Sequence, residues 1–100
     1  MSMTNRELFN AKNAGQKIEV GMIIEVVKIG EFSDTDKDGK DIIVSAMQSA
    51  DGTIYTTISA TIHDSMDLLG DILAEEGSVK VKVNENVSNN GRKFFQLQII

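Results

Sequence analysis

The alternation of apolar and polar residues predicts three β-strands in the first 60 residues. Residues 17–32 carry Ile and Val on both faces, which indicates a long strand that is buried on both sides. Residues 33–41 are polar and rich in Asp, which predicts a turn. Strands are expected at 42–49 and 53–60, because Asp51-Gly52 between them is a strong signal for a two-residue hairpin.

The spacing of apolar residues becomes helical in residues 62–76. The stripe consists of Ile62, Met66, Leu69 and Leu73, and Leu68 and Ile72 are expected to widen it. Thr61 or Asp64 can cap the start of this helix, and Gly77 can end it. Strict alternation returns in residues 79–84, and a last strand is expected over 92–100.

The order β-β-β-α-β-β predicts an all-β domain with one helix. We expect a five-stranded OB-fold Greek-key barrel over residues 17–100, with the helix between strands three and four. Gly21 and Gly30 interrupt the first strand, and bends there suit a strand that serves both sheets of a barrel. Residues 1–16 are expected to form an N-terminal arm or short helix, in which Thr4 and Glu7 match a capping box.

The composition excludes several classes of site. The chain has no Cys, which excludes disulfides, Cys-ligated metals and Cys nucleophiles. His63 is the single histidine, so a two-histidine metal site cannot form within one chain. No segment has the ~20 consecutive apolar residues of a membrane span, and the polar N-terminus does not match a signal peptide. We expect a cytoplasmic protein without catalysis, metal or cofactor.

Charge is unevenly distributed along the chain. Ten Lys and Arg against 15 Asp and Glu give a net charge of −5, which excludes a broadly basic nucleic-acid clamp. Residues 62–76 contain five acidic residues and no Lys or Arg, whereas residues 77–100 contain four basic residues and one acidic residue. Single-strand binders combine a basic groove with aromatic platforms for bases. The outward faces of the last two strands are therefore the candidate surface.

Three segments resemble the small OB-fold single-stranded-DNA-binding proteins of bacteriophages. They are GMIIEVVKIGEFSD in the first strand, DGTIYTTISATIHDSMDLL leading into the helix, and VKVKVNENVSNNGRKFFQLQI near the C-terminus. The resemblance runs from Lys17 to Ile100. It implies a phage-encoded protein that binds single-stranded DNA without sequence preference in replication or recombination. The negative net charge departs from the simplest picture of such a protein.

The expected contacts follow from residue type. Bases are expected to stack on Tyr55, Phe94 and Phe32, and Thr57 and Asn90 are expected to donate hydrogen bonds. The residues expected to meet phosphates are Lys28, Lys80, Lys82, Arg92 and Lys93.

Several of these residues have an equally simple interpretation without DNA. Tyr55 is explained as an exposed strand former, and Phe94 by cover from a second subunit or from Phe9 of the arm. Lys80 and Lys82 suit an edge strand that is protected from aggregation.

An Asp-rich stretch matches the first half of a calcium-binding loop. Asp34, Asp36 and Asp38 precede Gly39, but the twelfth position is Ser45 where a bidentate Glu is needed. A polar hairpin turn is therefore favoured.

The rival interpretation is an OB-fold adaptor that binds proteins through its acidic helix face. The partners under the two interpretations are single-stranded DNA, a second copy of the chain, and replication or recombination proteins. No membrane contact is expected.

Overall fold

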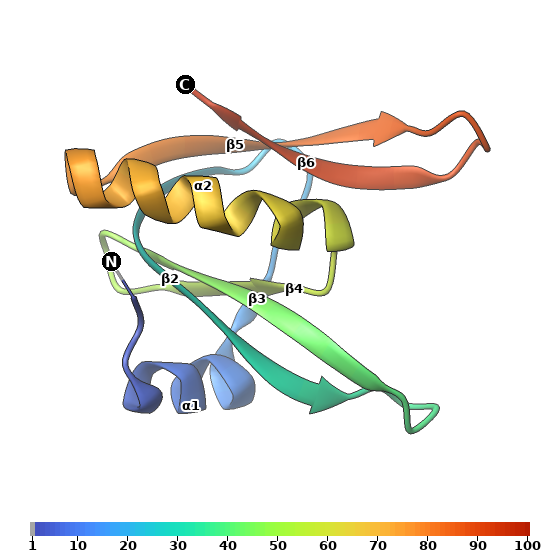
Figure 1. Cartoon of the computed structure of the whole chain (residues 1–100), viewed down its shortest axis with the longest axis horizontal. Coiled ribbons are helices and arrows are strands. Elements are labelled where there is room, and N and C mark those ends of the chain that lie inside the picture. The colour runs from blue at the N-terminus through green and yellow to red at the C-terminus, as the bar shows by residue number, and fades with distance from the viewer. Residues whose placement is uncertain (1) are drawn as a thin grey trace.

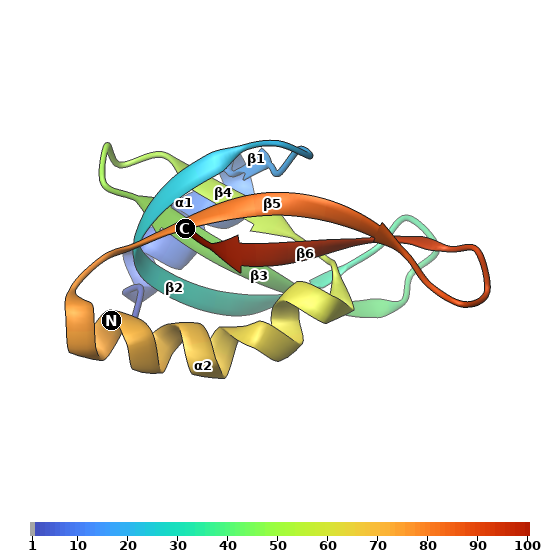
Figure 2. The ribbon, with the colours of Figure 1, turned by 90° about the horizontal axis from the view of Figure 1, so that it is seen from above.

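A curled sheet of six strands and two helices makes up residues 2–100, the part of the chain that the computed structural model describes (Figure 1). The elements are α1 Asn5–Ala14, β1 Gln16–Lys17, β2 Ile23–Thr35, β3 Asp41–Ser49, β4 Ile54–Thr57, α2 Ala60–Glu76, β5 Val79–Val87 and β6 Lys93–Ile99. The strands lie in the order β1-β4-β3-β2-β5-β6. Seen from above, the sheet curls into half of a barrel, and α2 runs along one side of it (Figure 2).

Strand β2 joins the two halves of the sheet. Residues 23–26 pair with β5, and residues from Val26 to Thr35 pair with β3. The register with β3 shifts between Val26 and Lys28, where the strand leaves one neighbour for the other. The strand therefore serves both halves of the sheet, but this irregularity does not lie at the predicted glycines.

The first predicted strand begins too early. Residues 18–22 leave the strand conformation, because Gly21 adopts a φ of +90° in a turn. Lys17 belongs instead to the short strand β1, which pairs in parallel with β4. Within residues 2–100 the sheet thus has six strands, one more than expected.

Helix α2 closes the inner face of the sheet, and its predicted apolar stripe is confirmed except at Leu68, which is 65% exposed. The buried residues of the helix are Ile62, Met66, Leu69 and Leu73. They pack with Val26, Met47 and the three buried valines of β5. The N-cap is Ser59, which precedes both predicted caps, Thr61 and Asp64. Gly77 ends the helix with a φ of +80°, as expected.

Helix α1 packs on the outer face of the same sheet. Its predicted capping box forms, since the Thr4 side chain accepts from the Glu7 amide and the Glu7 side chain accepts from the Thr4 amide. Ala11 and Met3 are buried against Ala46 of β3. The N-terminal segment therefore lies on the sheet. Neither helix in the described part of the chain is long and apolar enough to cross a membrane.

Two hairpins extend to the same side of the molecule (Figure 1). The β2–β3 turn at residues 36–40 is held by Asp36, whose Oδ1 accepts from the amides of Asp38 and Lys40, both at 2.9 Å. The β5–β6 turn at residues 88–92 is held by Ser88, whose Oγ accepts from the Arg92 amide at 3.2 Å. These hairpins enclose the surface described below.

The close approach of α1 to β2 gives a test of the packing. A Cβ at Gly30 would lie 2.8 Å from Leu8 Cδ2 and 3.1 Å from Met3 Cβ. We expect Gly30→Ala to lower the free energy of unfolding by about 1–3 kcal/mol, because the added methyl group overpacks this contact. Urea unfolding measures the loss, and amide exchange in α1 should accelerate. Ser33→Ala, at an exposed position of the same strand, is the control. Unchanged unfolding of Gly30→Ala would contradict this packing.

Candidate nucleic-acid interface

A groove of about 490 Å³ opens between α1, β1 and the outer part of the sheet. We call it the central groove. It is lined by Ala11, Lys12, Gly15, Lys17, Ile18, Phe32, Asp34, Ile42, Val44, Thr56, Thr57, Ile58 and Phe95.

The sheet register explains why the floor of the central groove is largely apolar and contains one carboxylate, that of Asp34. Phe32 of β2 lies opposite Val44 of β3, and Asp34 lies opposite Ile42. Side chains two residues apart on a strand share a face, so these four side chains form one patch. Phe95 of β6 contributes from the other half of the sheet. The floor is thus built from strands that are distant in the sequence.

A second hollow of about 350 Å³ adjoins the central groove, because Thr57, Ile58 and Phe95 line both. We call it the side hollow. Lys93 and Phe94 line it, together with residues 59–61 at the start of α2. Aromatic side chains line both hollows. The first turn of α2, beside the side hollow, contains no acidic residue.

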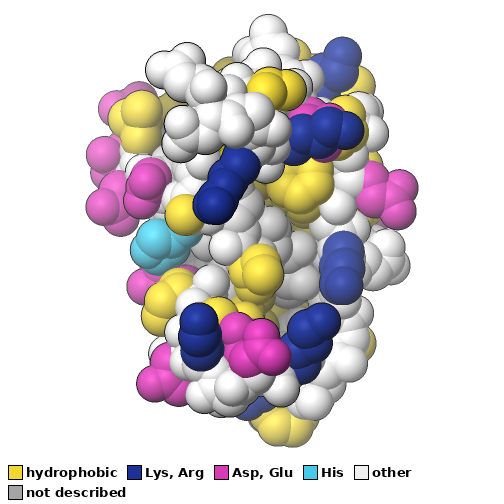
Figure 3. Space-filling model, turned by 90° about the vertical axis from the view of Figure 1, so that its right-hand side faces the viewer, with side chains coloured by type: hydrophobic (Ala, Val, Ile, Leu, Met, Phe, Trp, Pro, Cys, Tyr) yellow, Lys and Arg dark blue, Asp and Glu magenta, His cyan; other side chains and the backbone are white. Residues whose placement is uncertain are grey.

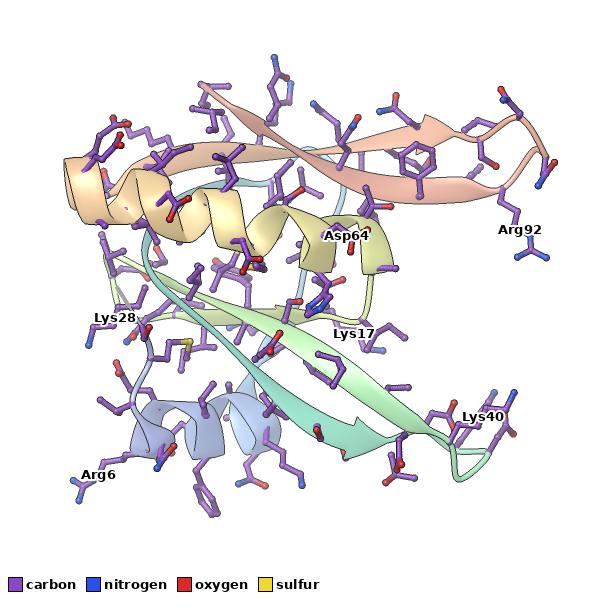
Figure 4. All side chains as sticks on the ribbon, in the orientation of Figure 1. Arg6, Lys17, Lys28, Lys40, Asp64 and Arg92 are labelled. Atoms are coloured by element: carbon purple, nitrogen blue, oxygen red, sulfur yellow. The ribbon has the colours of Figure 1, made fainter. Side chains whose placement is uncertain are left out.

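Basic side chains surround these hollows. Figure 3 shows the side with both hairpin tips, where Lys and Arg lie above, beside and below a hollow that contains apolar side chains. Lys40 and Arg92 lie at the two hairpin tips, and Lys17 lies between them nearer the body of the protein (Figure 4). Among the residues that line the two hollows, Lys12, Lys17 and Lys93 outnumber the one acidic residue, Asp34, although the whole chain is acidic.

Six of the ten predicted site residues lie at this surface. Phe32 and Thr57 line the central groove, and Thr57, Lys93 and Phe94 line the side hollow. Asn90 and Arg92 belong to the exposed tip of the β5–β6 hairpin. Thr57 Oγ1 accepts from the Ser59 amide at 3.1 Å, which leaves its hydroxyl proton free to donate elsewhere.

Tyr55 does not lie on an outward face, which corrects the prediction. It is opposite Met47 in the β3–β4 register, and Met47 is fully buried. Tyr55 accordingly packs against the main core, half-buried. The opposite face of this short strand carries Thr56, whose register partner Ala46 packs beneath α1.

Three predicted basic residues lie away from the groove. Lys80 and Lys82 are exposed on β5, where they face Glu25 and Ile23 across the ladder. Lys28 lies at the end of the molecule opposite the hairpin tips (Figure 4). Its Nζ is 2.9 Å from Oε2 of Glu7, so this ammonium group already has a carboxylate partner.

The structure adds three residues that were not among the predicted contacts. Lys12, Lys17 and Phe95 line the central groove. Phe95 packs against the core while it also lines the groove. No local pattern identifies Lys12 and Lys17, because only the docking of α1 and β1 places them there.

The Asp-rich turn has a structural use for its central carboxylate. Asp36 caps the turn by accepting hydrogen bonds from two backbone amides, as is typical of a polar hairpin.

His63 Nδ1 lies 3.2 Å from Glu31 Oε2 and 3.5 Å from Ser45 Oγ. Within residues 2–100, no three His, Asp or Glu side chains gather as a metal site would require.

Comparisons with known proteins identify relatives of the chain. The family model of the phage single-stranded DNA-binding proteins of the phi29 type matches residues 4–100. The single-stranded DNA-binding protein of Bacillus phage B103 is 35% identical over 94% of this chain and 84% of its own length. Those of Bacillus phages PZA and phi29 are each 33% identical over 93% of this chain and 82% of their own length. No solved structure matches the chain.

The ion pair between Glu7 and Lys28 predicts a pH-dependent contribution to stability. The Thr4 amide and the Lys28 ammonium group lower the pKa of Glu7 below its usual value of 4.5. Because the folded state prefers the ionised carboxylate, Glu7 stabilises the fold at pH values above its usual pKa. This stabilisation is lost as the pH falls through the pKa of the folded state. Glu7→Gln keeps the capping box but removes the charge. We expect it to cost less than about 1 kcal/mol at neutral pH.

Urea unfolding at pH 7 and pH 3 measures this contribution. The difference between Glu7→Gln and the unchanged protein should shrink at the lower pH. Glu19→Gln is the control, because Glu19 is exposed and forms no ion pair within residues 2–100. A difference that is the same at both pH values would contradict the charge-based explanation.

Proposed function

The chain belongs to the phage single-stranded DNA-binding protein family, and from this premise we propose that it binds single-stranded DNA in the central groove and the side hollow. The strand passes between the two hairpins, and sequence preference is weak because most contacts are made by stacking and by charge. Stacking and ion pairing need neither a cofactor nor a catalytic group. The observation that supports this proposal is the set of apolar and aromatic side chains in a groove with basic residues around it.

We propose that the domain is an open OB barrel. Apart from β1, the strand order is β4-β3-β2-β5-β6, so the first long strand lies between the second and the fourth. Helix α2 lies in the connection between the third and the fourth. Because β1 pairs with the edge of β4, it keeps β4 from closing the barrel with β6. OB folds bind nucleic acid on their second and third strands and between the loops that correspond to these hairpins.

The aromatic residues of the two hollows are the proposed stacking platforms. Phe32 lies on the floor of the central groove, and Phe94 lines the side hollow. Phe95 lines both and connects them. Successive bases can therefore stack on side chains from β2 and β6 while the backbone crosses between them. Tyr55 is not part of this proposal, because it packs against the core.

The phosphates are proposed to follow the basic rim. Lys12 and Lys17 lie on one wall, and Lys93 lies in the side hollow. Lys40 and Arg92 extend this rim to the hairpin tips (Figure 4). Asn90, exposed beside Arg92, is available as a donor. Lys28, Lys80 and Lys82 do not line either hollow and are not needed for this path.

A role in phage replication or recombination in the host cytoplasm belongs to the same proposal. Partner proteins or a second copy of the chain can then use surfaces outside the groove. One observation favours an additional adaptor role: Asp64, Asp67 and Asp71 are exposed along α2, opposite its buried stripe, beside a Leu68 that is 65% exposed. Elution volume on a sizing column, with and without DNA, distinguishes a monomeric binder from a dimer.

The stacking proposal is tested by aromatic-to-leucine substitutions. We expect Phe32→Leu and Phe94→Leu each to weaken binding of a 30-nucleotide oligo(dT) by ~5- to 100-fold, since one stacked base contributes roughly 1–3 kcal/mol. Fluorescence anisotropy of the labelled oligonucleotide measures the affinity. Leucine preserves apolar volume, which separates stacking from folding. The matched control is Phe9→Leu, because Phe9 is 67% exposed on α1 and lines neither hollow. Equal affinities for all three variants would overturn the assignment.

The phosphate path is tested through the salt dependence of binding. Each phosphate contact contributes ~0.7 to the slope of log affinity against log salt for a single strand. We expect Lys17→Gln to reduce the slope by about that amount and Lys80→Gln to leave it unchanged. The two substitutions remove the same charge from exposed positions, so net charge alone predicts the same effect from both. Equal reductions would show that the groove is not the path of the strand.

A further inference from the structure

The lining of the central groove contains a single acidic side chain among basic, apolar and threonine residues. Asp34 of β2 lines the groove together with Lys12 and Lys17. In the described part of the chain it has no ion-pair partner within 4.0 Å. A free carboxylate in a phosphate-binding groove repels the ligand backbone, so its presence calls for a contact with another part of the nucleotide.

The position of Asp34 relative to Phe32 indicates which part of the nucleotide Asp34 contacts. The two residues are two positions apart on β2 and share the face that lines the groove. Their Cα atoms are therefore roughly 6–7 Å apart. Ile42 and Val44 lie opposite them on β3 and form the apolar surroundings. A base that stacks on Phe32 then directs one edge toward the Asp34 carboxylate.

The carboxylate has an oxygen available for that edge. Asp34 Oδ1 accepts from the Thr35 amide at 2.8 Å, which fixes the side chain. Within residues 2–100 no hydrogen bond reaches Oδ2. A carboxylate oxygen accepts hydrogen bonds and does not donate them. Cytosine presents an exocyclic amino group as a donor, whereas thymine presents a carbonyl oxygen at the same position.

We propose that Asp34 accepts a hydrogen bond from the exocyclic amino group of the base stacked on Phe32, so that this subsite favours cytosine over thymine. This inference rests on the proposed function, and it adds a base preference to a surface that otherwise binds by stacking and charge. The repulsion between carboxylate and phosphate is the same for both bases. The difference expected at this subsite therefore comes from the base edge, where cytosine offers an amino hydrogen and thymine a carbonyl oxygen.

The test compares two oligonucleotides of equal length at pH 7.5. We expect the protein to bind oligo(dC) about 3- to 10-fold more tightly than oligo(dT), the size of one net hydrogen bond. A third oligonucleotide, with 2-pyrimidinone in place of cytosine, lacks only the amino group and should bind like oligo(dT). Equal affinities for oligo(dC) and oligo(dT) would overturn the base preference and leave single-strand binding intact. A lack of binding to all three would overturn the proposed function and this inference together.

The substitution Asp34→Asn tests whether the carboxylate causes the preference for cytosine. Asp34→Asn keeps an oxygen that can accept from the Thr35 amide, and it adds an amino group that can donate to the thymine carbonyl. We expect the dC-to-dT affinity ratio to fall to about one or below it. Asp38→Asn is the matched control, because Asp38 is exposed in the same hairpin and does not line the groove. It should keep the ratio of the unchanged protein. A ratio that survives Asp34→Asn would contradict the proposal.

Discussion

The change of pairing partner along β2 is the constraint on which the rest of the structure depends. One strand pairs with β5 through its first residues and with β3 through the remainder, and the register shift at Val26–Lys28 marks the change. Because a strand can serve two neighbours in this way only if the sheet curls, the two halves enclose α2 and the main core. The same curl brings the β2–β3 and β5–β6 hairpins to one side, and the proposed interface lies between them.

The proposed interface depends as much on α1 as on the curled sheet. Without a side chain at Gly30, Leu8 and Met3 approach β2 closely, and α1 covers the part of the outer face around Ala46. The groove is the part of that face which α1 leaves open, and the end of the helix supplies one wall of it. The negative charges of α2 lie on another side of the molecule, so the net charge of −5 does not describe the field that a DNA strand meets.

The sequence allowed the periodic features to be predicted, and the tertiary ones were missed. Helix α2 and its buried stripe follow from spacing alone, and the Thr4 capping box is a local motif. Strand β1 was not predicted because two residues give no period; their place is decided by pairing with β4. Tyr55 was misassigned for a related reason, since on a strand of four residues the buried face is chosen by the register with Met47. Lys12 and Lys17 reach the groove through the packing of α1 and β1, which no local pattern encodes.

The use of the single tyrosine in the core has a consequence for recognition. With Tyr55 packed against Met47, the proposed stacking relies on phenylalanine, which has no polar group to contact a base edge. Any distinction between bases must then come from polar groups beside the rings, and few of the residues lining the central groove are polar. The Lys side chains only donate, and a donor cannot recognise an exocyclic amino group. The Thr56 and Thr57 hydroxyls can donate or accept, so they do not distinguish an amino group from a carbonyl oxygen as a carboxylate does. Asp34, which is two residues from Phe32 on the same face, is the acidic residue in that lining and is thus the group suited to make the distinction.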